Sequence, residues 1–200
     1  MSMSVESIVI ATDLNKTFKA EQKGLDDVQA LQGINMQIKT GQLTALVGPD
    51  GAGKTTFLRL IAGLYKPTAG SLEVLGMDVA KDPQSVQDRI SYMPQKFGLY
   101  EDLSIQENLD LYADLHGVPM NVRKERFARL LKITDLARFT ERPAGKLSGG
   151  MKQKLGLACT LVRSPELLLL DEPRVGVDPL SRRDLWSIIE QLVREENLSV

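Results

Sequence analysis

The sequence lacks several features that would place it in a special class of proteins. Its 200 residues include one cysteine, Cys159, and one histidine, His116, so no disulfide can form within the chain. Basic residues number 25 against 26 acidic ones, a net charge of −1, so the basic excess of a general nucleic-acid binder is absent. The densest apolar run, Leu167 to Leu170, is far shorter than the roughly 20 residues that span a bilayer. The first residues have neither a basic start nor an apolar core, so we expect a cytoplasmic protein without a signal peptide.

What the sequence does have is the composition of a soluble globular domain. It is 42% apolar and 26% charged, and its length suits one domain with room for an inserted lobe. Short apolar segments at Leu43–Val47, Ile90–Met93 and Leu167–Leu170 predict strands that alternate with helices. This alternation favours an α/β fold with a mostly parallel sheet. From Ser104 to about Leu161 the pattern is helical, which predicts a helical lobe inserted into that core. Ser104 with Glu107 predicts a capping box at the start of its first helix, and Asn121 is the predicted cap of the next. Ser181 with Asp184 is the predicted cap of a last helix that ends near Glu195.

A glycine-rich turn follows the predicted strand Leu43–Val47 and opens a helix predicted over Lys54–Ala62. It fits G-x-x-x-x-G-K-[ST], the phosphate-binding loop. The glycines let successive backbone N–H groups surround phosphates, and the helix N-terminus adds positive potential. We expect Lys54 to contact the β- and γ-phosphates and Thr55 to bind magnesium. The residues predicted to bind the nucleotide here are Gly48, Pro49, Asp50, Gly51, Ala52, Gly53, Lys54, Thr55 and Thr56.

Two carboxylates follow the apolar strand Leu167–Leu170. Asp171 is predicted to hold magnesium, and Glu172 to polarise the attacking water as a general base. Taken alone, the same residues fit a core strand that ends in a helix cap. The phosphate-binding loop upstream favours the metal and the base.

A third motif, Leu147-Ser148-Gly149-Gly150-Met151, precedes a helix predicted to end near Val162. Ser148 is a suitable N-cap, and the two glycines leave space for an anion. The three motifs in this order resemble the nucleotide-binding cassette of the ABC ATPases, and the resemblance covers essentially the whole chain. It implies an α/β P-loop NTPase fold with ABC ATPase architecture: a mostly parallel core sheet, an antiparallel β subdomain and an inserted helical subdomain. By this resemblance the core with the β subdomain comprises 1–94 and 163–200, and the helical subdomain 95–162.

The resemblance also implies roles for single residues, with ATP and Mg²⁺ as cofactors. ABC cassettes work as head-to-tail pairs, so the ATP of one cassette is capped by Ser148, Gly149 and Gly150 of a second cassette. Gln95 matches the Q-loop glutamine, which contacts magnesium or the lytic water, and Asp178 matches the D-loop, which crosses to the partner's site. Phe18 lies where an aromatic ring stacks on adenine; a core phenylalanine is the alternative.

Further segments narrow the resemblance to one branch of the ABC ATPases. Gly98–Ser104 with Glu107–Leu109, together with Gly176–Pro179, is similar to the ABC-2 type exporter ATPases. Asp50, Met93–Phe97 and Val177–Arg183 are most similar to the exporter ATPases in which two cassettes share one polypeptide. This implies ABC-2 permease subunits as partners, no nucleic acid, a position on the inner face of the membrane, and drug or xenobiotic efflux. It also implies that the chain is the N-terminal part of a longer protein. The sequence pattern itself predicts that Ser199–Val200 opens one more strand.

A groove for a transporter helix is a further possibility at Lys96–Leu103, where Phe97, Leu99 and Tyr100 follow the Q-loop. Packing within the helical lobe is the alternative for this apolar cluster.

Three departures from the family pattern bear on activity. Asp50 replaces the usual Asn, which we expect to weaken nucleotide binding, and Arg174 replaces a Thr and is expected to lie at the surface. The switch histidine of the family would fall just past Val200, and His116 cannot replace it. We therefore expect this chain to bind ATP with magnesium and to hydrolyse it slowly.

One alternative to an export motor stays open, and another is disfavoured. The chain fits a degenerate regulatory cassette that clamps ATP while its partner hydrolyses it. A soluble ABC ATPase of translation or DNA repair is disfavoured, because fewer than 100 residues separate Lys54 from Ser148 and no broad positive surface is predicted.

Overall fold

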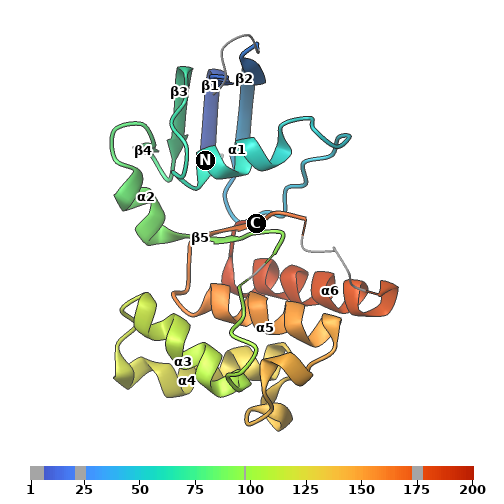
Figure 1. The fold of residues 1–200 in the computed structure, drawn as a ribbon. Coiled ribbons are helices and arrows are strands. Elements are labelled where there is room, and N and C mark those ends of the chain that lie inside the picture. Colours follow the sequence, from blue (N-terminus) through green and yellow to red (C-terminus); the bar gives the residue numbers. More distant parts are fainter. Residues whose placement is uncertain (1–6, 21–25, 97, 173–177) are drawn as a thin grey trace. The chain divides into compact units, whose positions relative to one another are not determined.

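The structure, a computed structural model, describes residues 7–20, 26–96, 98–172 and 178–200 (Figure 1). The chain divides into two compact units: unit 1 is Met1–Ile90 with Asn197–Val200, and unit 2 is Ser91–Glu196. Among the described residues, no helix combines the length and the apolar character needed to cross a membrane.

Unit 1 is built on an antiparallel sheet of four strands, as the resemblance to the ABC cassettes predicts. The strand order is β2-β1-β3-β4, and β1 runs antiparallel to both β2 and β3. Buried side chains of β1 and β3, including Val9, Leu14 and Leu72, form the core beneath it. The strands are β1 (Ser7–Phe18), β2 (Val28–Lys39), β3 (Ala69–Val74) and β4 (Met77–Asp78).

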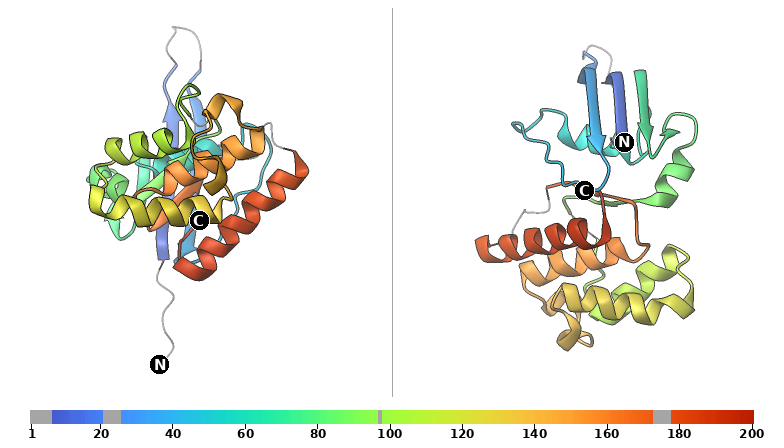
Figure 2. Two further views of the ribbon diagram at one scale, coloured as in Figure 1. Left: turned by 90° about the horizontal axis from the view of Figure 1, so that it is seen from below. Right: turned by 180° about the vertical axis from the view of Figure 1, so that it is seen from behind.

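Two helices complete unit 1. Helix α1 (Lys54–Ile61) lies against one face of the sheet and buries Phe57 and Leu60 (Figures 1 and 2). Helix α2 (Pro83–Arg89) was not predicted, although its start carries a clear signal. Asp82 accepts a hydrogen bond from Ser85 N at 3.1 Å, and a proline at the first helical position suits a helix start.

The predicted strand Leu43–Val47 is wrong, because these residues form no ladder in the described structure. Val47 is 95% exposed and Leu43 40%. A strand needs a neighbour that pairs along its length. Here Thr44 N donates a backbone hydrogen bond to Val200 O, and Val200 N donates one to the O atom of Gln42, which precedes the segment.

Unit 2 combines a small parallel sheet with the predicted helices. Strands β5 (Ile90–Met93) and β6 (Leu167–Leu170) pair with each other and lie where they were predicted. Helices α5 and α6 lie side by side in every view (Figures 1 and 2). The helices are α3 (Ile105–Leu115), α4 (Met120–Ile133), α5 (Gly149–Leu161) and α6 (Pro179–Glu196), with 3₁₀ turns at Ala137–Phe139 and Ala144–Lys146.

Helix caps show how far local sequence signals hold. The capping box at the start of α3 is as predicted: Ser104 Oγ accepts from Glu107 N, and Glu107 Oε2 accepts from Ser104 N at 2.7 Å. The predicted cap of α4 at Asn121 is wrong, because the helix begins at Met120, directly after Pro119. The predicted cap of α6 at Ser181 is also wrong, because the side chain of Asp178 caps that helix.

Candidate nucleotide-binding site

The turn that opens α1 requires glycine at position 53. Gly53 has a φ of +85°, a left-handed conformation that favours glycine. A Cβ at this position would lie 2.5 Å from Ala30 O and 2.7 Å from a methyl group of Leu31. Both backbone conformation and space therefore fix a glycine where the loop passes into the helix.

Lys54 folds back over this loop. Its Nζ donates hydrogen bonds to Gly48 O and Pro49 O, both at 2.9 Å. The side chain starts in the first turn of α1, so the ammonium and the helix N-terminus add positive potential at the same place. The loop is thus arranged around a positive charge, as binding of a polyphosphate requires.

The loop is open to solvent. Residues 48–52 are exposed, and 53–56, which include Thr55 and Thr56, are half-buried. The Asp50 side chain is therefore exposed on a loop predicted to bind an anion. The residues predicted to bind the nucleotide through this loop, 48–56, all lie on one segment of unit 1.

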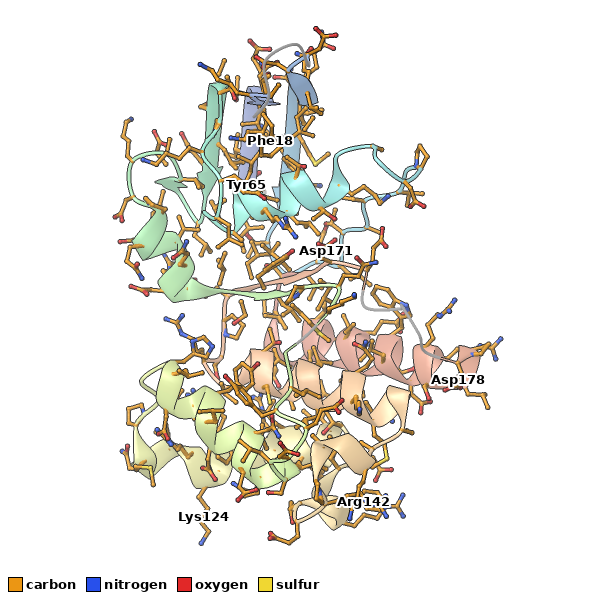
Figure 3. All side chains as sticks on the ribbon, in the orientation of Figure 1. Phe18, Tyr65, Lys124, Arg142, Asp171 and Asp178 are labelled. Atoms are coloured by element: carbon orange, nitrogen blue, oxygen red, sulfur yellow. The ribbon has the colours of Figure 1, made fainter. Side chains whose placement is uncertain are left out.

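Phe18 lies at the end of β1 and is half-buried, so it is not part of the core of unit 1. Its ring and that of Tyr65 pack edge to face, with ring centroids 5.3 Å apart and planes at 77° (Figure 3). Lys16 Nζ lies 4.8 Å from the Phe18 centroid and donates to Lys66 O at 3.0 Å. These contacts hold the Phe18 ring in one orientation at the rim of the sheet.

Tyr65 connects Phe18 to the helix of the phosphate-binding loop. Arg59, near the end of α1, donates from Nη1 to the Tyr65 hydroxyl at 3.1 Å. Sequence analysis missed Tyr65, Arg59 and Lys16. One signal was available for Lys16, because residues two apart on a strand share a face.

Asp171 is buried directly after β6, with 3% of its surface exposed. The Tyr92 hydroxyl on β5 donates to Asp171 Oδ2 at 2.8 Å, and Asp171 N donates to Met93 O at 3.0 Å. The sheet therefore holds both the backbone and the carboxylate of Asp171. Sequence analysis missed Tyr92, because nothing in the strand pattern shows which residue its hydroxyl meets.

Glu172 and Gln95 meet in unit 2, at the ends of the two parallel strands. Gln95 Nε2 donates to Glu172 Oε2 at 3.3 Å. The backbone of Glu172 has a φ of +47°, an uncommon conformation for a residue with a side chain and one that clusters at functional sites. The two residues predicted to act on the lytic water are thus brought together.

The signature segment opens α5. Ser148 Oγ accepts a hydrogen bond from Met151 N at 3.3 Å and caps the helix, as predicted. A hydroxyl that accepts one hydrogen bond can still donate its own proton, so Ser148 can cap α5 and bind an anion together. Ser148 and Gly149 are exposed, whereas Gly150 is buried.

Asp178 lies at the start of α6, where its Oδ1 accepts hydrogen bonds from Leu180 N and Ser181 N, both at 3.0 Å. Hydrogen bonding from Ser181 lowers the pKa of this carboxyl below its ordinary value of 3.8. The role of Asp178 in a partner's site stays a prediction. Three earlier expectations concern residues outside the described part of the chain: the groove residue Phe97, the substitution at Arg174 and the D-loop pair Gly176–Val177.

Comparison with known proteins relates these motifs to a family. A model of the ABC transporter family matches residues 31–175. The chain is 54% identical over 190 residues to the probable multidrug ABC transporter ATP-binding protein YbhF of Escherichia coli (strain K12), covering 95% of this chain and 32% of that protein. It is 37% identical to the daunorubicin resistance ATP-binding protein DrrA3 of Streptomyces coeruleorubidus, covering 88% of this chain and 56% of that protein. The chain thus spans about a third of the first of these relatives and just over half of the second.

Comparison with solved structures relates the chain to the same kind of protein. The chain superposes on the dimeric, post-hydrolysis ATP-binding cassette MJ0796 bound to ADP and Pi with a TM-score of 0.81 and 26% identity, covering 96% of this chain and 85% of that one. The predicted P-loop NTPase fold with ABC ATPase architecture is confirmed, as is the resemblance to ATP-binding proteins of drug exporters. The chain belongs to the ABC transporter family.

Proposed function

We propose that this chain is the ATP-binding and ATP-hydrolysing cassette of an ABC-2 type exporter, which couples ATP binding and hydrolysis at a head-to-tail cassette dimer to efflux of a drug or xenobiotic. The observation that carries the proposal is the loop before α1, which folds around the Lys54 ammonium at a helix N-terminus. Such an arrangement binds phosphates by backbone N–H groups and positive charge.

ATP would be held at both ends by unit 1. The phosphates would replace the carbonyls of Gly48 and Pro49 as acceptors for Lys54, because a phosphate oxygen carries more negative charge. The base would stack on Phe18, whose ring orientation Tyr65 and Lys16 fix. We further propose that the core with the β subdomain is formed by 1–94 and 163–200 and the helical subdomain by 95–162.

The residues proposed for magnesium fit that ion. Thr55, Asp171 and Gln95 offer a hydroxyl, a carboxylate and an amide oxygen, and Mg²⁺ prefers such oxygen ligands. Asp171 is buried and orientated by Tyr92, as a metal ligand needs to be. When bound with ATP, the ion would neutralise charge on the phosphates.

Hydrolysis would depend on Glu172 and Gln95. Glu172 would accept a proton from the attacking water. Gln95, which donates a hydrogen bond to the Glu172 carboxylate, would orientate both that carboxylate and the water. The signature residues Ser148, Gly149 and Gly150 of a second cassette would cap the γ-phosphate, and Asp178 would reach the partner's site from the D-loop.

The proposed partners are a second cassette, in the same or another chain, and ABC-2 permease subunits that hold the cassette at the inner face of the cell membrane. The dimeric cassette among the structural neighbours supports the first. The names of the drug-exporter relatives support the permease subunits as partners and a drug or xenobiotic as the transported cargo. No nucleic-acid partner is proposed.

Nucleotide binding and hydrolysis can be tested on the chain directly. ATP with Mg²⁺ is expected to raise its melting temperature, Lys54→Ala to abolish the shift, and Glu172→Gln to keep the shift but lose phosphate release. No shift for the unsubstituted chain would contradict the proposal. A shift without phosphate release, even when a second cassette is supplied, would instead support the degenerate regulatory cassette.

A further inference from the structure

Gly150 lies in the first turn of α5, where the helix comes unusually close to α6. A Cβ built on Gly150 would lie 2.5 Å from the Cβ of Ser181 and closer still to Ser181 Oγ, but 3.8 Å from Ser181 Cα. Carbon atoms in contact are separated by roughly 3.5–4.0 Å. A side chain at position 150 is therefore incompatible with this approach as long as residue 181 has a Cβ.

The backbone of α5 does not by itself require a glycine. Gly150 is inside the helix, where alanine is a much better helix former than glycine. The position is also buried. Space for Ser181, rather than backbone conformation, explains the glycine.

A second contact fixes the same two helices one turn further on. Lys154 Nζ lies 3.2 Å from Asp184 Oδ2, and the Lys154 side chain is only 16% exposed. Lys154 follows Gly150 by four residues and Asp184 follows Ser181 by three, so both contacts advance by about one turn in the same direction. Together they set the register between α5 and α6, which lie side by side (Figures 1 and 2).

The packing of Ser181 on Gly150 also involves the D-loop residue Asp178. Asp178 accepts hydrogen bonds from the backbone of Leu180 and Ser181, so the residue that packs on Gly150 is held by the D-loop aspartate. Ser148 caps α5 two residues before Gly150. Within unit 2, the signature serine and the D-loop aspartate are thus connected through the packing of Ser181 on Gly150.

We propose that Gly150 and Ser181 are positioning residues that lock the signature helix to the D-loop of the same cassette. The inference rests on the proposed function, in which both segments meet the site of a second cassette. Locked in this way, Ser148 and Asp178 are presented to that site as one rigid piece. The alternative is that Gly150 is a glycine only to let the γ-phosphate approach.

The two explanations differ in whether a change at Ser181 rescues a change at Gly150. The variants are Gly150→Ala, Ser181→Gly, G150A/S181G and G150A/S181A, each in a Glu172→Gln background so that ATP persists. The last is the matched control, because alanine keeps the Cβ that glycine removes. One readout is ATP-dependent self-association by sedimentation. The other is amide hydrogen exchange of residues 149–152 without nucleotide.

We expect G150A to weaken self-association at least about tenfold and to speed exchange, because the first turn of α5 is displaced. G150A/S181G is expected to return both to within about threefold of the parent, whereas G150A/S181A is not. The inference is overturned if G150A changes neither readout, if G150A/S181G stays as defective as G150A, or if alanine rescues as well as glycine. Loss of association with unchanged exchange would show that the glycine serves the phosphate, and would also overturn it.

Two further outcomes are decisive. If G150A fails to fold and G150A/S181G folds, the contact is confirmed; if both fail to fold while Ser181→Gly folds, it is refuted. If the parent does not associate with ATP, the proposed function fails, and exchange in the nucleotide-free chain still decides whether Gly150 and Ser181 position the helix.

Discussion

The hydroxyl of Tyr92 donates a 2.8 Å hydrogen bond to Asp171 Oδ2, and so joins strand β5 to the carboxylate proposed to bind magnesium. The two residues are 79 positions apart in the sequence. Because Asp171 is buried, its carboxylate needs hydrogen-bond partners. Tyr92 is therefore expected to act on the proposed metal site through Asp171.

Tyr92→Phe is expected to raise the Mg²⁺ concentration needed for half-maximal ATP binding by about tenfold, because Asp171 loses the group that orientates it. The loss of one hydrogen bond costs about 1 kcal/mol, so the chain should stay folded. Titration of Mg²⁺ against a fixed concentration of fluorescent ATP measures the effect. Tyr100→Phe is the matched control, since Tyr100 is 54% exposed. An unchanged Mg²⁺ requirement in Tyr92→Phe would refute the role.

Tyr65→Ala is expected to weaken ATP binding by about fivefold, because Phe18 loses the ring that fixes its orientation, and base stacking on aromatic side chains contributes about 1–3 kcal/mol. Tyr65→Phe keeps the edge contact and loses the bond from Arg59, so its effect should be smaller. Inorganic triphosphate has no base, and its affinity should not change in either variant. A parallel loss of triphosphate binding would mean that Tyr65 shapes the phosphate loop rather than the base site.

Asp50→Asn is expected to strengthen ATP binding by about twofold to fivefold, because it removes a negative charge from the exposed loop that is proposed to hold the phosphates. The gain should shrink as salt rises, since exposed charges are screened. Isothermal titration at two salt concentrations measures both effects. Asp88→Asn, on α2, controls for net charge alone. Equal affinities of Asp50→Asn and the parent at low salt would count against the effect.

Asp178→Ala should lower the melting temperature by a few degrees, because α6 loses its N-terminal cap. Asp178→Asn should not, because asparagine caps helices well. Folding lowers the pKa of Asp178, so the stability it contributes is present above about pH 4 and is lost as the pH falls through the folded-state pKa. Asp178→Asn should therefore lose less stability than the parent between pH 5 and pH 3. Equal acid sensitivity of the two proteins would contradict this assignment.

Local signals in the sequence predicted much of the fold. The strands Ile90–Met93 and Leu167–Leu170 have the predicted bounds, and the capping box at Ser104 and Glu107 forms as expected. Each depends on residues that are close in the chain. The strand predicted at Leu43–Val47 failed because a strand also needs a partner along its length, which its own sequence does not specify.

The residues of the candidate site were likewise predicted only where a local sequence motif specifies them. Short motifs of consecutive residues predicted the loop glycines, Lys54, Thr55 and the carboxylates after β6. The residues that hold Phe18 and Asp171 in place, Tyr65, Arg59 and Tyr92, were missed because each acts on a residue of another element. The sequence by itself therefore determined which groups are predicted to bind phosphate, metal and water. Only the tertiary structure decided which side chains hold those groups in place, because contacts between distant segments depend on how the strands and helices pack.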